Sequence, residues 1–207
     1  MRSVAFASIL LALGIAGCGD PNAGALFADI QYATRCEMAA TPHCGSPVNR
    51  DICGIDSGDP CTPDAPNPQL SCNIQESADG TRTLEFNASQ GSGFALTISQ
   101  AIFAPGSTSA GGAGCRVVLV EGANRYSGAC GASPPSEAQP CQITSVRFYD
   151  DEGNPTVEGA LYCEGLQNTA NPTLTIEVTQ VGSGPGPAMT PGRFRLANCA
   201  GLTVPAE

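Results

Sequence analysis

Apolar and polar residues alternate along most of the chain from about residue 70 onward. Leu84 and Phe86 are separated by a polar residue, and so are Phe94, Leu96 and Ile98. A period of two is typical of strands that bury one face and expose the other. The pattern predicts strands near 70–76, 83–87, 94–99, 115–120, 125–130, 142–149, 156–163, 173–179 and 192–197.

Turn signals separate these strands, and no helical pattern lies among them. Ala78–Gly80, Glu121–Asn124 and Asp150–Asn154 carry the Gly, Asn and Asp residues that tight turns prefer. Two longer Gly-rich connections, 105–114 and 182–192, are expected to be surface loops or crossings between sheets. About nine short strands predict an all-β domain over 69–207, either an antiparallel β-sandwich or a partly closed barrel.

The chain before residue 69 reads differently. Within 18–40, Leu26, Ile30 and Ala33 recur at helical spacing after the capping residue Asn22, which predicts a tether with one short helix. A disordered linker up to Phe27 is the alternative. Residues 41–68 hold six Pro and three Cys, and proline removes backbone donors from strands and helices. This segment is therefore predicted to be a Cys/Pro-rich loop held by its own disulfides.

The first 18 residues have the form of an export signal. Arg2 is followed by an uncharged apolar run from Val4 to Ile15, which is shorter than the roughly 20 residues that span a membrane. The ending Ile15-Ala16-Gly17-Cys18 resembles the lipobox of bacterial lipoproteins. The resemblance implies that residues 1–17 are a signal peptide that is removed and that Cys18 is acylated. An ordinary secretory signal cut near Gly17, with Cys18 a plain thiol, is the alternative.

This resemblance also implies a location and a membrane contact. The protein is expected to be exported and anchored in the bacterial cell envelope by several acyl chains on Cys18, since one chain holds only weakly. Gly19 follows Cys18, and we see no inner-membrane retention signal there, so the outer membrane is preferred.

The cysteine count agrees with this view. Eleven Cys are an odd number, and acylation of Cys18 leaves ten, enough for five disulfides in an oxidising compartment. The ten are Cys36, Cys44, Cys53, Cys61, Cys72, Cys115, Cys130, Cys141, Cys163 and Cys199.

The alternation of faces along the predicted strands suggests how some of these cysteines pair. Setting Cys141 opposite Cys163 places the apolar Val146 opposite Glu158, which conflicts with the pleat. The preferred pairing is Cys130–Cys141, with Cys163–Cys199 and Cys72–Cys115 following by elimination. A Cys115–Cys130 bridge across one hairpin is the rival.

Charge and missing residue types exclude several functions. The mature chain has 8 Arg against 19 Asp and Glu, a formal charge of 8 − 19 = −11, and it has no Lys. Such a surface repels nucleic acid and anionic lipid. Without Lys there is no Schiff-base or phosphate-loop chemistry, and a single His43 excludes zinc sites built on several imidazoles. No cofactor is expected.

One pair of fragments resembles a protease. Thr41–Cys44 and Asp56–Pro60 are similar to the histidine and serine motifs of chymotrypsin-like proteases. However, Asp59 stands where that family has Gly, and only 14 residues separate His43 from Ser57. In that fold the two catalytic residues lie on different barrels, so the pair is not predicted to be catalytic.

The remaining candidates are polar clusters. Asp51, Asp56, Asp59 and Asp64, and separately Asp150, Asp151, Glu152 and Asn154, offer oxygens that suit Ca²⁺, but solvated loops explain them as well, and no metal site is assigned. Arg193 and Arg195 indicate a solvated strand face, with a carboxylate-binding patch as the alternative. The chain has no Trp and its tyrosines are scattered, which disfavours carbohydrate recognition, although Tyr32, Tyr126, Tyr149 and Tyr162 keep it open.

The function expected from the sequence is that of a lipid-anchored, non-catalytic binding or structural module with a protein or saccharide partner. An envelope hydrolase that uses acidic residues is one alternative, and a Ca²⁺-stabilised adhesion or recognition domain is another.

Overall fold

The computed structural model describes residue 24 and residues 26–36, 48–53, 69–90, 93–179 and 191–204. These residues form eleven strands and no helix, so the predicted all-β class is confirmed. The strands are β1 (Phe27–Cys36), β2 (Val48–Cys53), β3 (Gln69–Glu76), β4 (Arg82–Gln90), β5 (Phe94–Phe103), β6 (Arg116–Glu121), β7 (Asn124–Gly131), β8 (Cys141–Asp151), β9 (Asn154–Asn168), β10 (Thr175–Thr179) and β11 (Gly192–Ala197).

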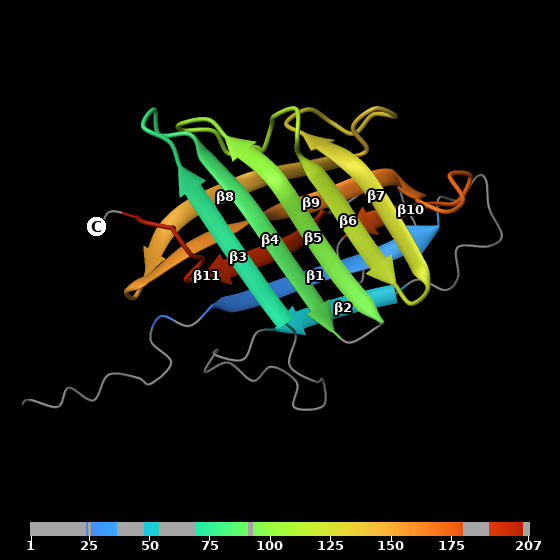
Figure 1. Ribbon diagram of the computed structural model, residues 1–207, viewed down its shortest axis with the longest axis horizontal. Coiled ribbons are helices and arrows are strands. Elements are labelled where there is room, and N and C mark those ends of the chain that lie inside the picture. Colours follow the sequence, from blue (N-terminus) through green and yellow to red (C-terminus); the bar gives the residue numbers. More distant parts are fainter. Residues whose placement is uncertain are drawn as a thin grey trace, which may run out of the picture.

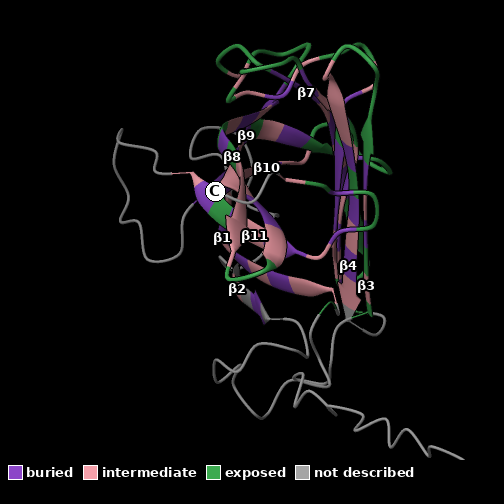
Figure 2. Ribbon diagram, turned by 90° about the vertical axis from the view of Figure 1, so that its left-hand side faces the viewer, coloured by how far each residue is buried: buried purple, intermediate pink, exposed green. Residues whose placement is uncertain are grey.

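All of these strands belong to one sheet that is folded into two layers. Its order is β10-β1-β11-β9-β8-β7-β6-β5-β4-β3, with β2 paired to β1. Strands β3 to β7 form one layer, and the remaining strands form the second layer behind it, running across the first (Figures 1 and 2). The pairings between the named strands are antiparallel except for a short parallel contact between β7 and β8, where the sheet passes from one layer to the other.

The core lies between the two layers. Leu84, Leu96 and Leu119 point inward from the first layer, and Ile30 and Leu196 point inward from the second. Their neighbours along each strand face outward, as the period-two pattern predicts. Burial alternates strictly along most of β5, where Phe94, Leu96 and Ile98 are buried between half-buried residues.

The predicted short helix within 18–40 is wrong, because Phe27–Cys36 is strand β1. Ala28, Ile30, Tyr32 and Thr34 alternate inward and are buried. Leu26, Ile30 and Ala33 fit a helix only because short apolar runs match both periods. Pairing to β2 on one side and to β10 and β11 on the other decides for the strand.

The loop predicted over 41–68 contains a strand as well. Val48–Cys53 forms β2 in a stretch without proline, and its Ile52 is buried in the core. The prediction of no regular structure in this segment is therefore wrong for these six residues. Residues 41–47 and 54–68 lie outside the described residues, as do residues 1–17, which are predicted to be a signal peptide.

The Gly-rich connection 105–114 links the layers. It leaves β5 and returns to β6, and Ile102 and Gly111 exchange backbone hydrogen bonds at its base. The Ala110 N–H donates to the Ile143 carbonyl, and the Val146 N–H donates to the Thr108 carbonyl, both at 2.9 Å. The connection thus reaches from the first layer to β8 of the second. Most of 182–192 lies outside the described part of the chain.

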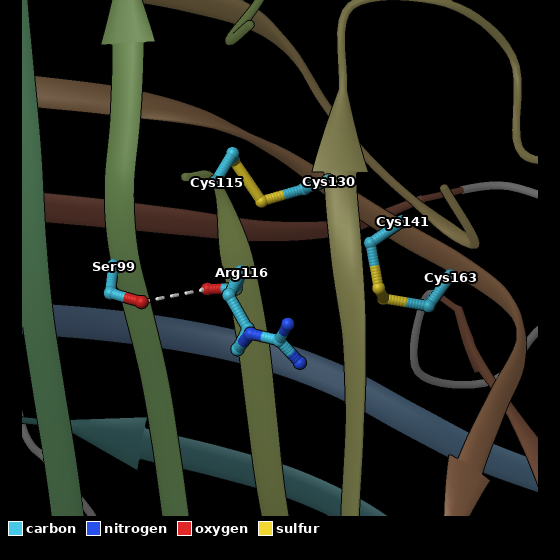
Figure 3. The surroundings of a disulfide bond; sticks show 6 residues. All are labelled: Ser99, Cys115, Arg116, Cys130, Cys141 and Cys163. Atoms are coloured by element: carbon cyan, nitrogen blue, oxygen red, sulfur yellow. Dashed lines mark hydrogen bonds between the residues drawn. A yellow bond between two sulfur atoms is a disulfide. The ribbon is translucent and has the colours of Figure 1, made fainter. Parts of the chain in front are cut away.

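Three disulfides are present among the described residues: Cys72–Cys199, Cys115–Cys130 and Cys141–Cys163. The preferred pairing Cys130–Cys141 and the two that follow from it are therefore wrong, and the rival Cys115–Cys130 is correct. Cys130 and Cys141 do lie opposite each other on β7 and β8, but each bonds to its antiparallel neighbour instead (Figure 3). The side chains of Cys18, Cys36, Cys44, Cys53 and Cys61 are outside the described set.

A β-bulge explains why the register argument against Cys141–Cys163 failed. From Cys141 to Thr144 the two strands pair in the register that places Cys141 opposite Cys163. The register then shifts by one residue, so that Phe148 lies opposite Val157. The bulge lies between Thr144 and Arg147 and includes Ser145, which has a φ of 55°. The bulge therefore satisfies both the cysteine pair and the apolar pair.

Candidate functional site

A cluster of polar and aromatic side chains lies between the layers at one end of the core. Tyr32 and Arg50 are register neighbours on β1 and β2, and Phe94 and Glu121 are register neighbours on β5 and β6. The Tyr32 hydroxyl donates to the Glu121 carboxylate at 3.1 Å, and the Arg50 Nε donates to both carboxylate oxygens at 3.1 and 3.2 Å. The Arg50 guanidinium also lies 5.4 Å from the centre of the Phe94 ring.

The electrostatics of this cluster follow from its burial. Burial raises the pKa of Tyr32 well above its usual value, and the nearby Glu121 carboxylate raises it further, so the phenol stays protonated and donates. The hydrogen bond to Glu121 likewise raises the pKa of Arg50. Each polar group is satisfied by another member of the cluster, which joins the two layers across 71 and 89 residues of sequence.

Replacing Glu121 by alanine is expected to destabilise the fold by roughly 2–4 kcal/mol, because it leaves the buried Tyr32 hydroxyl and the half-buried Arg50 without their acceptor. Glu76→Ala is the matched control, since Glu76 pairs with Arg82 at the surface and should cost less than about 1 kcal/mol. Urea unfolding measures both variants. Equal losses in the two would show that the cluster has no special role in stability.

The free energy of unfolding at alkaline pH gives a second measurement of the same cluster. Because the folded pKa of Tyr32 is raised, the unfolded chain loses this proton first. The contribution of Tyr32 is therefore complete below its ordinary pKa of about 10 and is lost as the pH rises toward the folded value. Tyr32→Phe should make the decline above that pH less steep.

The outer face of the second layer carries paired charges. Arg195 lies opposite Glu158, which lies opposite Arg147 on the next strand. Glu158 binds Arg147 and accepts a 2.8 Å hydrogen bond from the Tyr149 hydroxyl. Partial burial alone would raise the pKa of Glu158, but these hydrogen bonds outweigh it and lower the pKa.

The solvated face predicted for Arg193 and Arg195 is confirmed, since Phe194 and Leu196 between and beside them are buried. Arg195 forms an ion pair with Asp151, and Arg193 donates to the Gln31 side-chain oxygen at 2.7 and 3.1 Å. Both guanidinium groups therefore have partners within the protein.

The acidic stretch 150–154 forms the turn between β8 and β9. The Asp150 carboxylate accepts from the Gly153 N–H at 2.6 Å, and Glu152 and Gly153 both have positive φ, at 54° and 90°. These contacts serve the turn itself. Within the described residues no group of three or more His, Cys, Asp or Glu side chains is placed to hold a metal ion. The side chains of Asp51, Asp56, Asp59, Asp64, His43 and Ser57 lie outside that set.

The four tyrosines are not gathered at one site. Tyr32 and Tyr126 are buried in the core, and Tyr149 binds Glu158 on the outer face of the second layer. Tyr162 lies on β9, opposite Gln142. An aromatic platform built from these four residues is therefore not formed.

A hollow of about 300 Å³ lies on the outer face of the first layer. Its outward-facing residues come from three neighbouring strands and are mostly small and uncharged. We call them the outer polar face: Ser71 and Asn73 on β3, Glu85 and Asn87 on β4, and Thr97 and Ser99 on β5. Ser71 lies opposite Asn87, and Asn87 lies opposite Thr97, so the residues form rows across the strands.

A second bulge lies beside this hollow. Leu84 pairs with Ala101 and Phe86 pairs with Ile98, so two residues of β5, Ser99 and Gln100, face Glu85. Gln100 has a φ of 50°. Such a bulge bends a strand and increases its twist locally, which accounts for a concave patch on an otherwise regular sheet.

Sequence reasoning missed the outer polar face. The alternation of β3, β4 and β5 shows that these six residues face solvent, but their being neighbours depends on the register and the bulge. The local signal that could have drawn attention to them is the scarcity of charge among the exposed positions of these strands.

A second hollow, of about 380 Å³, lies at the other end of β4 and β5. Arg82 lies 4.6 Å from the centre of the Phe148 ring there, and it also binds Glu76 and the Thr203 carbonyl. Phe148 packs edge-on against Phe103. The one cation of this hollow's lining is thus held by groups of the protein itself.

Comparison of the chain with protein-family models, with curated proteins and with solved structures gives no match in any of the three. The described part of the chain contains no helix that could cross a membrane.

Proposed function

We propose that this chain is a lipid-anchored lipoprotein of the bacterial cell envelope that acts as a non-catalytic binding or structural module, with the outer polar face as its binding surface. The observation that carries this proposal is the set of three disulfides, whose six cysteines are all buried in the core. Disulfides of this kind persist in oxidising compartments and indicate an extracytoplasmic environment.

The anchor is supported by residues 15–18, whose resemblance to a lipobox implies acylation at Cys18. Acylation of Cys18 would also leave an even number of the eleven cysteines free to form disulfides. The outer membrane is the preferred location, since Gly19 carries no retention signal that we recognise.

The binding role is supported by how the polar groups are arranged. Tyr32 and Arg50, whose pKa values are raised, bind Glu121 in the cluster between the layers, and Glu158 binds Arg147 on the second layer. In contrast, the described residues provide no hydrogen-bond partner for the side chains of Asn73 and Glu85 on the outer polar face. A hollow with unoccupied donors and acceptors suits recognition of a ligand.

Photocrosslinking in intact envelopes tests this function. Benzoylphenylalanine in place of Thr97 should capture one dominant envelope component. The amount of this adduct should reach a plateau once all of that component is bound. The control carries the same group in place of Glu164, an exposed residue of β9 in the second layer, and should not capture it. Identical adducts from both positions, or none from Thr97, would refute the outer polar face as a binding surface.

A further inference from the structure

We infer that the outer polar face binds a neutral, hydroxyl-rich glycan, held by the Glu85 carboxylate and the amide groups of Asn73 and Asn87. This inference rests on the proposed function, because it names the ligand of that same surface. It follows from which hydrogen-bonding groups the hollow leaves free.

The first free groups are donors. The Thr97 hydroxyl donates to the Asn87 side-chain oxygen at 3.0 Å, so the Asn87 amide nitrogen is left to donate outward. Asn73, two residues from Ser71 on the edge of the hollow, contributes a second amide. Donors of this kind require a ligand with acceptor oxygens.

The other free group is an acceptor. Glu85 is exposed and lies opposite Asn73 on the neighbouring strand. It is the one charged side chain of the hollow's lining. Among the described residues none forms an ion pair with Glu85, so its carboxylate is free to accept hydrogen bonds from a ligand.

These two requirements favour a neutral ligand that both donates and accepts over a charged one. An ammonium or guanidinium group only donates, so it would satisfy Glu85 and the Asn73 side-chain oxygen but not the amide nitrogens of Asn73 and Asn87. An anion would satisfy the amides but would be repelled by Glu85 and by the net charge of the chain, −10 over all 207 residues. A hydroxyl group both donates and accepts, and neighbouring hydroxyls of a sugar can bind a carboxylate and an amide together.

The shape of the hollow agrees with this ligand. Ser71, Thr97 and Ser99 are small, so a ring can approach the strands closely where the bulge bends the sheet. The hollow contains no outward-facing aromatic side chain on which a sugar could stack, since its Phe86 is buried. Hydrogen bonds must therefore supply most of the affinity, and a membrane-anchored array would add avidity.

Titration of the mature protein with oligosaccharides tests the inference. The exported chain, labelled with ¹⁵N and kept in a detergent without a sugar headgroup, is titrated separately with chitotetraose and with cellotetraose. At least one of these should shift the backbone amides around Asn73, Glu85, Asn87 and Thr97. Whichever binds more tightly distinguishes an acetamido glycan from a plain one.

Matched variants separate the carboxylate from general charge effects. Glu85→Gln should weaken binding by about tenfold or more, because it removes a charge-assisted hydrogen bond. Glu164→Gln makes the same change of charge on the second layer and should bind like the wild type. Asn73→Ala should also weaken binding, and a tetragalacturonate, which is anionic, should bind at least about tenfold more weakly than the neutral sugars.

Several results would overturn the inference. These are the absence of shifts up to about 10 mM of either neutral sugar, undiminished binding by Glu85→Gln, or tighter binding of tetragalacturonate or tetra-arginine. If the Thr97 crosslinker captures a protein while neither sugar binds, the glycan is refuted and the binding module stands. If the sugars bind but the protein is found outside the envelope, the location fails and the glycan stands.

Discussion

Replacement of Cys18 by serine is expected to move the protein completely from the membrane fraction to the soluble fraction of the envelope. The sulfur of Cys18 is the atom that the lipobox resemblance marks for acylation, and each buried CH₂ of an acyl chain contributes about 0.8 kcal/mol to membrane binding. We expect several chains to act together, so that their loss removes attachment altogether. We expect no other contact to compensate, since an acidic chain without Lys is repelled by anionic lipid.

Fractionation and intact-mass measurement check this expectation. Gly17→Ala is the matched control, because it changes the neighbouring residue but keeps a small side chain at the cleavage site. That variant should be acylated and remain with the membrane. Wild-type protein that dissolves without detergent and carries an unmodified Cys18 would contradict the anchor.

Removal of the Cys72–Cys199 bridge should be the most damaging loss among the three described disulfides. This bridge closes 127 residues, whereas Cys115–Cys130 closes 15. The chain-entropy treatment gives about 4–5 kcal/mol for the long loop and about 3 kcal/mol for the short one, because the longer loop restricts the unfolded chain more. The bridge also holds the segment around Ala200 against the edge of β3, where Ile74 donates to the Ala200 carbonyl at 2.8 Å.

The paired variants Cys72→Ala with Cys199→Ala, and Cys115→Ala with Cys130→Ala, make a fair comparison, since all four side chains are buried. The first pair should lower the Tm by roughly 10–15 °C, and the second should lower it less. Thermal unfolding under oxidising conditions measures both. An equal or reversed order would mean that native-state packing, and not loop closure, dominates the effect of these bridges.

Local patterning predicted the nine strands after residue 69 because a strand that buries one face must alternate. Such a pattern is visible along β4, β5 and β10 without knowledge of their partners. It fails for β1, whose Leu26, Ile30 and Ala33 also match a helix, and for β2, where nearby prolines hide six residues that can pair. The backbone hydrogen bonds between strands decide both conformations: β1 pairs with β11 and with β2, and β2 pairs with β1.

The disulfides also show which features the sequence predicts and which depend on the tertiary structure. The sequence correctly offers Cys115–Cys130 as a hairpin bridge, but it rejects Cys141–Cys163 because it assumes an unbroken register. The bulge at Ser145 inserts one residue and removes the conflict. A bulge depends on how two strands pack against the rest of the sheet, so the residues of one strand do not reveal it.

By itself, the sequence determined the all-β class, the outward or inward side of residues along most strands and the acidic composition, because each depends on local pattern or composition. Only the tertiary structure decided which distant residues meet. Tyr32, Arg50 and Glu121 come together from three strands, and the outer polar face comes together from three others. These contacts depend on the strand register, on the bulges and on the folding of the sheet into two layers. All three features arise from pairing between strands that are far apart in the chain.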